Sequence, residues 1–375
     1  MERLKVQGLF LLTLAAALAA QDDTAQLRQD IASLKASVAQ LQRSEETNAD
    51  ASFTLSGYAA AGYAYAEHTD GGFDLVQFSP IFQYAYKDLI SFTGELETKM
   101  NEDLETSVEL EYATLNLFLN DYMVLVAGKF LSPLGQFRQN LHPSWINKLP
   151  TEPIGFGEDG AAPVSFTGLA LRGGIPVGSL RTNYVLFIAN APVLELSDDN
   201  STIGAIAAEG PTSSDTAGYT VGLRYAVDPL PNCEIGVAGA IGKAAAEDEV
   251  KRDYSVFDAD VSWHVDALDL KAEYSQQTAG RKSGSVAPDA YTWRAWYAQL
   301  AYQFDALHLE PVVRYGVFEP ADSDYDRDQV VLGLNYLFAP AVIVKAAYEI
   351  NHADNADMAP EYDDNRFLAQ IAFGF

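Results

Sequence analysis

From residue 53 onward, the chain consists of short segments in which apolar residues alternate with polar or small ones. Within residues 89–99, for example, Ile90 and Phe92 alternate with Ser91 and Thr93. A period of two residues is typical of a β-strand with one apolar and one polar face. We therefore predict strands and no helix in this part of the chain. The predicted strands are residues 53–66, 73–86, 89–99, 104–118, 121–130, 165–174, 179–190, 218–228, 232–243, 253–265, 267–276, 290–304, 307–318, 328–338, 341–351 and 366–375.

The lengths of the connections favour a membrane barrel over a soluble β-sandwich, whose strands would alternate in the same way. Every second connection is a short turn, whereas the others are mostly longer loops rich in Asp, Ser, Gly and Pro. Outer-membrane barrels have short periplasmic turns, longer external loops and an even number of strands. The sequence therefore predicts an all-β fold, a 16-stranded antiparallel transmembrane β-barrel over residues 51–375. The predicted short turns are residues 87–88, 119–120, 175–178, 229–231, 266, 305–306 and 339–340.

Residues 1–19 have the pattern of a secretory signal peptide. Arg3 and Lys5 precede a short apolar run, and residues 17–19 (Ala-Leu-Ala) form the small-x-small pattern that signal peptidase reads. The apolar run is too short to span a bilayer as a helix, which favours cleavage over a permanent anchor. We expect an exported protein.

Residues 20–50 predict a periplasmic coiled-coil segment followed by a polar joint. Its apolar residues are spaced alternately by four and three positions, which is the heptad pattern. A coiled coil of about three heptads is weak by itself, so we expect a homotrimer that also uses the small-residue wall at Ala59, Ala61 and Tyr63. A single amphipathic helix is the alternative reading of the segment. The apolar positions are Leu27, Ile31, Leu34, Val38 and Leu41.

The charge and cysteine content exclude several classes of partner and site. The chain has 24 Lys and Arg against 52 Asp and Glu, a formal net charge of -28, which argues against nucleic acid as a partner. Cys233 is the single cysteine, so the chain cannot form an internal disulfide or a Cys-rich metal site. We expect no cofactor and no metal, and partners limited to outer-membrane lipid, lipopolysaccharide and small hydrophilic solutes.

The polar face of each strand is expected to line the barrel interior, because the apolar face contacts lipid. Acidic side chains then gather on the third and fourth strands, and three arginines on the sixth to eighth. Opposed arcs of acid and base would produce a transverse field in the opening. In the alternative, these groups pair with their neighbours and fill the lumen. The predicted acidic lining is Glu95, Glu97, Glu105, Glu109 and Glu111, and the predicted basic lining is Arg172, Arg181, Arg224, Arg314, Lys129, Lys271 and Lys345.

The longest insertion, residues 131–164, follows the fifth predicted strand. It is rich in proline and aromatic residues and carries modest charge, as expected for a packed rather than a solvated loop. We predict that it folds inward as a constriction loop; the alternatives are a cap outside the barrel or a contact with a neighbouring subunit. The candidate constriction residues are Phe137, Arg138, Trp145, Lys148, Glu152, Glu158 and Asp159.

The start of this loop reads Gly128-Lys-Phe-Leu-Ser-Pro-Leu-Gly135. It resembles the Gly-x-Phe-x-x-Pro-x-Gly segment of porins of the phosphate-selective O/P type, as does the overall plan that ends on Phe375. The resemblance implies a location in the outer membrane of a Gram-negative bacterium, with the N-terminal segment in the periplasm. Phosphate selectivity does not carry over, because phosphate-selecting members line the path with many Arg and Lys, whereas this lining is mixed with a slight acidic majority.

We therefore expect an outer-membrane porin with a water-filled channel for passive diffusion of small hydrophilic solutes and ions, with a modest preference for cations. The alternatives are a solute-specific channel for an organic acid, sugar or anion, and a structural or adhesive surface barrel. An enzyme is not expected, because His142 and Ser144 share a loop but lack an evident orienting partner. The run of aspartates from Asp322 to Asp328 lacks the glycine and glutamate of a calcium loop.

Overall fold

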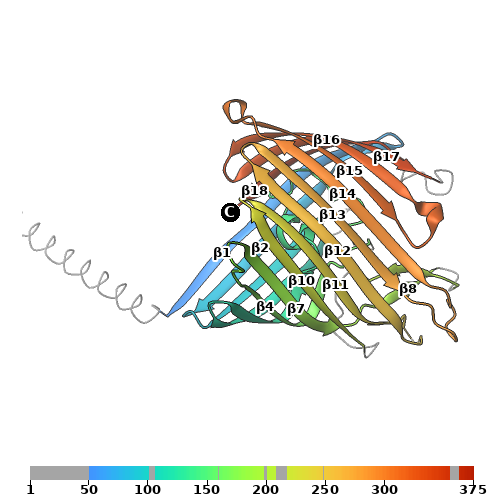
Figure 1. Ribbon diagram of the computed structural model, residues 1–375. Coiled ribbons are helices and arrows are strands. Elements are labelled where there is room, and N and C mark those ends of the chain that lie inside the picture. The colour runs from blue at the N-terminus through green and yellow to red at the C-terminus, as the bar shows by residue number, and fades with distance from the viewer. Residues whose placement is uncertain are drawn as a thin grey trace, which may run out of the picture. The chain divides into compact units, whose positions relative to one another are not determined.

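The computed structural model describes residues 50–100, 106–158, 160–197, 201–207, 218–247, 249–354 and 363–375. Sixteen of its strands close into one antiparallel barrel (Figure 1). Each lies within a few residues of its predicted position, which confirms the predicted fold class. The barrel strands are β1 (Ala51–Ala66), β2 (Thr69–Tyr86), β3 (Ile90–Met100), β4 (Thr106–Asn120), β5 (Met123–Leu131), β6 (Ser165–Gly174), β7 (Arg181–Asn190), β10 (Tyr219–Leu230), β11 (Cys233–Ala244), β12 (Arg252–Val265), β13 (Leu268–Ala279), β14 (Tyr291–Tyr302), β15 (Leu309–Glu319), β16 (Arg327–Ala339), β17 (Val342–Ala353) and β18 (Arg366–Gly374).

The first and last strands pair with each other and close the ring. β1 pairs with β18 from Tyr58 opposite Gly374 to Ala66 opposite Arg366. Beyond the last strand residue, Phe375 and Gly57 exchange two backbone hydrogen bonds of 2.9 Å. Because each strand thus has two neighbours, no backbone edge is left unpaired in the wall.

Alternation assigns the two faces of each strand. On β16, Leu332 and Leu334 are about half exposed on the outside, whereas Val331 and Asn335 on the other face are fully buried. The same division on the other strands gives an apolar outer surface, as a barrel in lipid requires. The polar faces are therefore directed into the barrel.

The structure departs from the sequence prediction in four connections. The predicted absence of helix is wrong in detail, since residues Phe137–Leu141 form a π-helical turn and Asp305–Leu307 and Ser323–Tyr325 form single 3-10 turns. A hairpin of β8 (Leu194–Leu196) and β9 (Ile203–Ile206) also forms where only an irregular loop was expected. No helix among the described residues is long and apolar enough to cross a membrane.

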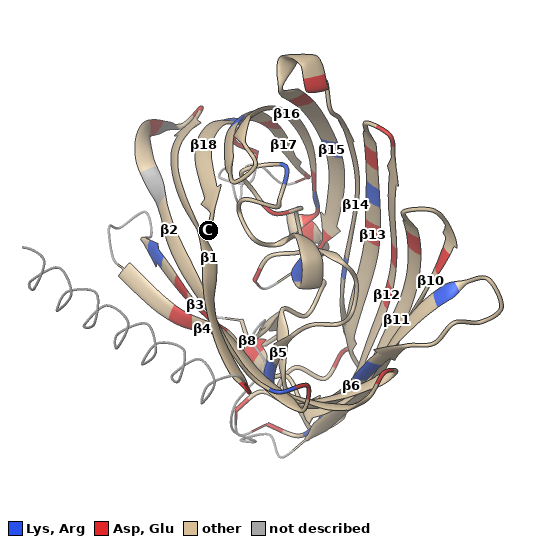
Figure 2. Ribbon diagram, turned by 90° about the vertical axis from the view of Figure 1, so that its left-hand side faces the viewer, with Lys and Arg blue, Asp and Glu red and all other residues tan. Residues whose placement is uncertain are grey.

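The loop of residues 131–164 enters the barrel, and its π-helical turn lies within the ring of strands (Figure 2). Phe137 and Phe156 pack edge-on against Tyr297 of β14, at centroid distances of 6.4 and 5.1 Å. These rings belong to an apolar cluster that includes inward side chains of β12 to β15. Burial of this cluster fills one side of the interior and draws the loop toward it.

Buried cations hold the far part of the loop. Arg314 of β15 donates to the carbonyl oxygens of Thr151 at 3.0 Å and Glu152 at 2.8 Å. Lys345 of β17 donates to the carbonyl of Asn147 at 2.6 Å, and also to that of Ser144. Both cations are about 1% exposed, so these carbonyls replace the water that each would otherwise bind.

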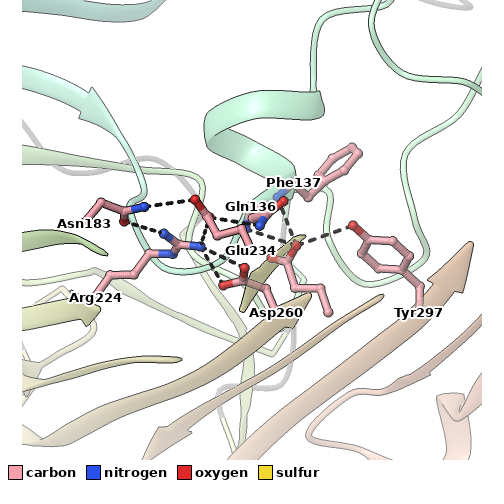
Figure 3. A network of polar contacts seen from close by, with 8 residues as sticks. Gln136, Phe137, Asn183, Arg224, Glu234, Asp260 and Tyr297 are labelled. Carbon is pink, nitrogen blue, oxygen red and sulfur yellow. Dashed lines mark hydrogen bonds and ion pairs between the residues drawn. The ribbon is translucent and has the colours of Figure 1, made fainter. Parts of the chain in front are cut away.

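A second group of contacts fixes the start of the loop (Figure 3). Glu273 of β13 accepts the backbone N–H of Gln136 at 3.2 Å and that of Phe137 at 2.9 Å. The Gln136 amide donates to Glu234 at 3.0 Å, and Glu234 accepts from Arg224 at 2.9 Å. Arg224 also pairs with Asp260 at 2.8 Å. We refer to Gln136, Arg224, Glu234, Asp260 and Glu273 as the loop anchor.

Gly135 is the residue that lets the loop approach the anchor, and its replacement tests the anchor. Its φ is +84°, and a Cβ there would collide with the Glu273 carboxylate. Gly284 has a φ of +86° with open space around it. We expect Gly284→Ala to cost only about 1 kcal/mol of backbone strain. Gly135→Ala should cost about 3 kcal/mol more, because Glu273 must give up two charge-assisted hydrogen bonds.

The measurement is trypsin cleavage within residues 131–164 of the folded barrel, where Arg138 and Lys148 are the cleavable positions. Gly135→Ala should speed cleavage strongly, while Gly284→Ala should match the parent protein at these positions. Equal rates in the two variants would contradict the anchoring role of Glu273.

Candidate functional site

Among the described residues, two sizeable cavities lie inside the barrel beside the wall of β2 to β6, which the loop leaves uncovered. The outer chamber, of about 280 Å³, lies toward the long loops, and Gln77, Glu97, Lys99, Glu111, Arg138 and Glu158 line it. The inner chamber, of about 310 Å³, lies toward the short turns, and Thr93, Glu95, Thr114, Asn116, Arg172 and Val185 line it. Loop 131–164 contributes to both, so it divides the free space of the interior.

Carboxylates outnumber cations in the outer chamber. Lys99 pairs with Glu97 at 2.6 Å. Arg138 makes a bidentate contact with Glu152 at 3.1 and 2.9 Å. Burial raises the pKa of Glu158, an effect that Lys99 partly offsets. Since each of the two cations already has one carboxylate partner, Glu111 and Glu158 give the chamber a negative excess.

A β-bulge positions the acidic residues of β4. The pairing of β3 with β4 shifts between Glu95 and Leu96, so that Tyr112 lies opposite Glu95 and Leu110 opposite Leu96. Glu111 is the extra residue. A bulge lets consecutive residues face the same side, and here Glu111 lines the outer chamber while Tyr112 lines the inner one.

The inner chamber has a polar and an apolar side. Arg172 of β6 donates to Asn116 of β4 at 3.1 Å and is otherwise turned to the cavity. Val126, Phe130 and Val185 form the apolar side. The chamber therefore offers one guanidinium beside an apolar surface.

His142 of the loop lines both chambers. Its Nδ1 lies 2.6 Å from the carbonyl oxygen of Arg138, and its Nε2 lies 3.9 Å from Glu95 Oε1. The Tyr58 hydroxyl donates to the same Glu95 oxygen at 2.7 Å. Burial lowers the pKa of His142, but the carboxylates of Glu95 and Glu111 outweigh that effect and raise it. Sequence reasoning considered His142 only as a catalytic candidate, although it is the one histidine in the loop.

Three of the predicted acidic lining residues come together at the chambers. Glu95 lines the inner chamber, and Glu97 and Glu111 line the outer one. Glu109 is partly buried and lies opposite Glu97 in the strand pairing. Glu105 lies outside the described residues.

The predicted basic arc does not form, and this corrects the expected separation of acid and base across the opening. Arg172 alone among the predicted basic residues lines a chamber. Arg224 is paired with two carboxylates, Arg314 and Lys345 bind loop carbonyls, and Arg181 is exposed at the end of β7. Lys271 pairs with Asp269 of the same strand at 2.6 Å, and Lys129 donates to the Leu110 carbonyl of the neighbouring strand at 2.8 Å. A buried cation needs a partner, which explains why so few remain free.

The predicted constriction residues divide into two groups. Arg138, Glu152 and Glu158 line the outer chamber. The others serve packing or pairing: Phe137 is buried in the apolar cluster, Trp145 packs on the backbone of Gly374, and Lys148 pairs with Glu310. Asp159 lies outside the described residues.

Asp258, Asp260 and Glu234 were missed as interior groups, although alternation along β11 and β12 places all three on the inward face. Asp258 and Asp260 are buried beside Glu273. In the described parts of the chain, no group of three or more His, Cys, Asp or Glu residues is arranged to hold a metal ion.

Comparison with known proteins assigns the family resemblance. Residues 214–375 match the family model described as phosphate-selective porin O and P. No curated protein matches the sequence.

Several solved structures share the fold at low identity. The outer membrane channel DcaP of Acinetobacter baumannii is 12% identical with a TM-score of 0.60, over 88% of this chain and 98% of that one. An anion-selective porin from Comamonas acidovorans is 13% identical with a TM-score of 0.58, over 87% and 100%. The trimer form of OmpT from Vibrio cholerae is 11% identical with a TM-score of 0.55, over 87% and 99%. The family match over residues 214–375 therefore shows that this part of the chain resembles porins of the phosphate-selective O and P type, and the closed 16-stranded barrel is the fold of the outer-membrane proteins named above.

Proposed function

We propose that the protein is a passive diffusion channel for small hydrophilic solutes and ions, with a modest preference for cations. The observation that carries this proposal is the use of the interior basic side chains. Arg224, Arg314 and Lys345 hold the loop, whereas Glu95, Glu97 and Glu111 line the chambers. Charge that lines the free space acts on a permeating ion more strongly than charge already paired within the wall.

The balance of charge along the chambers supports the cation preference. Glu95, Glu97, Glu111, Glu152 and Glu158 are the lining carboxylates. The lining cations are Lys99, Arg138 and Arg172, apart from His142, whose charge depends on pH. The family description points to phosphate, and a selectivity of that kind would need unpaired cations in the path. Arg172 is the one lining cation that has no carboxylate partner among the described contacts.

The first prediction concerns reversal potentials in a potassium chloride gradient across a planar bilayer. Removing a unit charge about 4 Å from an ion changes its energy by about 1 kcal/mol even at the dielectric constant of water, a factor of about five. Glu97→Gln and Glu111→Gln should therefore each lower the potassium-to-chloride permeability ratio, with the effect fading at high salt.

Asp88→Asn is the matched control, because Asp88 is exposed in the turn between β2 and β3, away from both chambers. It should leave the permeability ratio unchanged. A parent protein that prefers chloride in dilute salt would overturn the cation preference while leaving the diffusion channel intact.

A solute-specific channel is a second candidate, favoured by the two-sided inner chamber. Arg172 offers a site for an anionic group beside the apolar Val126, Phe130 and Val185. An organic anion with an apolar body matches this arrangement, because both parts of the ligand would find a complementary surface.

Current block by permanently ionised sulfonates tests the second candidate. Benzenesulfonate should reduce the single-channel current at lower concentration than methanesulfonate, which has no ring. Arg172→Gln should weaken that block by about tenfold, as expected for loss of a charged hydrogen bond. Arg181→Gln is the control, since Arg181 is exposed at the end of β7. Equal block by the two sulfonates would leave only the diffusion channel.

We also propose a homotrimer in the outer membrane. The trimer form of the similar barrel from Vibrio cholerae supports this assembly. The outward side chains Ala59 and Ala61 of β1 and Ala369 of β18 give a small-residue surface that suits close contact between barrel walls. The predicted signal peptide and the predicted periplasmic coiled coil both lie outside the described residues and stay predictions, as do the lipid and lipopolysaccharide contacts.

Deletion of residues 21–46 tests the contribution of the coiled coil. If the segment joins subunits, the variant should dissociate to monomers at lower detergent concentration or temperature, while each barrel stays folded and conducting. Native gels and light scattering in detergent would measure the change. An unchanged assembly would contradict the coiled coil, and a monomeric parent protein would contradict the trimer.

A further inference from the structure

His142 occupies the boundary between the two chambers with one ring nitrogen unsatisfied. Its side chain is about 8% exposed, and it lines both cavities. The Nε2 atom has no hydrogen-bond partner among the described residues. Its nearest charged neighbour is Glu95, at 3.9 Å, which is an ion-pair distance and too long for a hydrogen bond. Since His142 is the residue that the two linings share, the His142–Glu95 pair lies at the boundary of the chambers.

The backbone fixes which nitrogen carries the first proton. A carbonyl oxygen can only accept, so the Arg138 carbonyl at 2.6 Å requires Nδ1 of His142 to donate. In the neutral ring, Nε2 then directs a lone pair toward the Glu95 carboxylate. A second proton on Nε2 replaces this repulsion by attraction. The ring thus has two states that differ by one charge at the same place.

The charged and titratable groups around the ring come from four elements. Glu95 of β3 and Glu111 of β4 are the acids, and Arg138 of the same loop is the base. The ring of Tyr58 of β1 lies edge-on at a centroid distance of 6.5 Å. The hydroxyl of Tyr58 donates to Glu95 and so keeps that carboxylate in place whichever state His142 adopts.

We propose that His142 determines the ion preference at the junction of the chambers: its protonated ring neutralises Glu95, and loss of the proton leaves one additional negative charge in the path. The inference rests on the proposed diffusion channel and deepens it. The same residue would make a cation-preferring passage more selective as the pH rises.

The sign and the pH range follow from the surroundings of the ring. Since the pKa of His142 is raised above its ordinary value of about 6.5, the ring is still mostly protonated at pH 6.5 and loses its proton at a higher pH. Free carboxylates titrate near pH 4 and free lysines above pH 10. A change in selectivity above pH 6.5 that is absent from the His142→Gln variant is therefore assigned to this ring.

The experiment measures reversal potentials of the full-length protein in planar bilayers, at a fixed potassium chloride gradient, from pH 5 to pH 9. The potassium-to-chloride permeability ratio should rise in one step of about fivefold, the effect of one unit charge about 4 Å from the ion. His142→Gln should abolish the step and keep the high ratio at every pH, because glutamine does not become charged and so never neutralises Glu95. The glutamine amide can still donate to the Arg138 carbonyl, which keeps the loop in place.

Glu95→Gln is the second variant and also guards against a folding defect in the first. Without the carboxylate, the His142 proton is held less tightly, so the step should move to lower pH. His308→Gln, in the turn before β15, and His68→Gln, at the β1–β2 connection, are the controls and should keep the parent profile.

The outcomes separate the inference from the function on which it rests. A conducting parent protein with a flat pH profile, or a His142→Gln variant that keeps the step, overturns the inference alone. A parent protein that does not conduct removes the proposed channel and the inference together.

Discussion

The position of loop 131–164 depends on buried cations that bind its backbone. Arg314 and Lys345 sit on inward strand faces, where each would be unstable without a partner, and the loop carbonyls supply the oxygens. Each side satisfies the other, because the carbonyls of an irregular segment inside a barrel also need donors. At the start of the loop the charge is negative instead of positive: the buried carboxylate of Glu273 accepts hydrogen bonds from two backbone N–H groups.

This use of charge decides the electrostatics of the free space. Basic groups that hold the loop are removed from the path, and the carboxylates of β3 and β4 have no such task. The electric field along the chambers therefore depends on the charged side chains that do not hold the loop. The β-bulge at Glu111 refines the result, because it shifts the inward face by one residue and places acidic and neutral groups at different depths.

The histidine at the chamber boundary joins these two effects. Its Nδ1 donates to the Arg138 carbonyl and so stabilises the loop, while its Nε2 faces the Glu95 carboxylate at the chamber boundary. A residue with one nitrogen in each environment can change its charge without changing its place. The packing that seats the loop thus also sets the charge that a solute meets.

The sequence by itself determined the barrel, because the period of two along each strand and the alternating lengths of the connections are local properties of the chain. It also predicted that Glu95, Glu97 and Glu111 share the inward face, since parity along a strand needs no knowledge of its neighbours. It failed for Arg224 and Arg314, which parity places inside without naming their partners. Asp260 lies 36 residues from Arg224, and the Glu152 carbonyl lies 162 residues from Arg314, so these groups meet only in the closed fold. The tertiary structure alone therefore decided which charges are paired, because burial forces a charge to take a partner and only the closed fold fixes which partner is within reach.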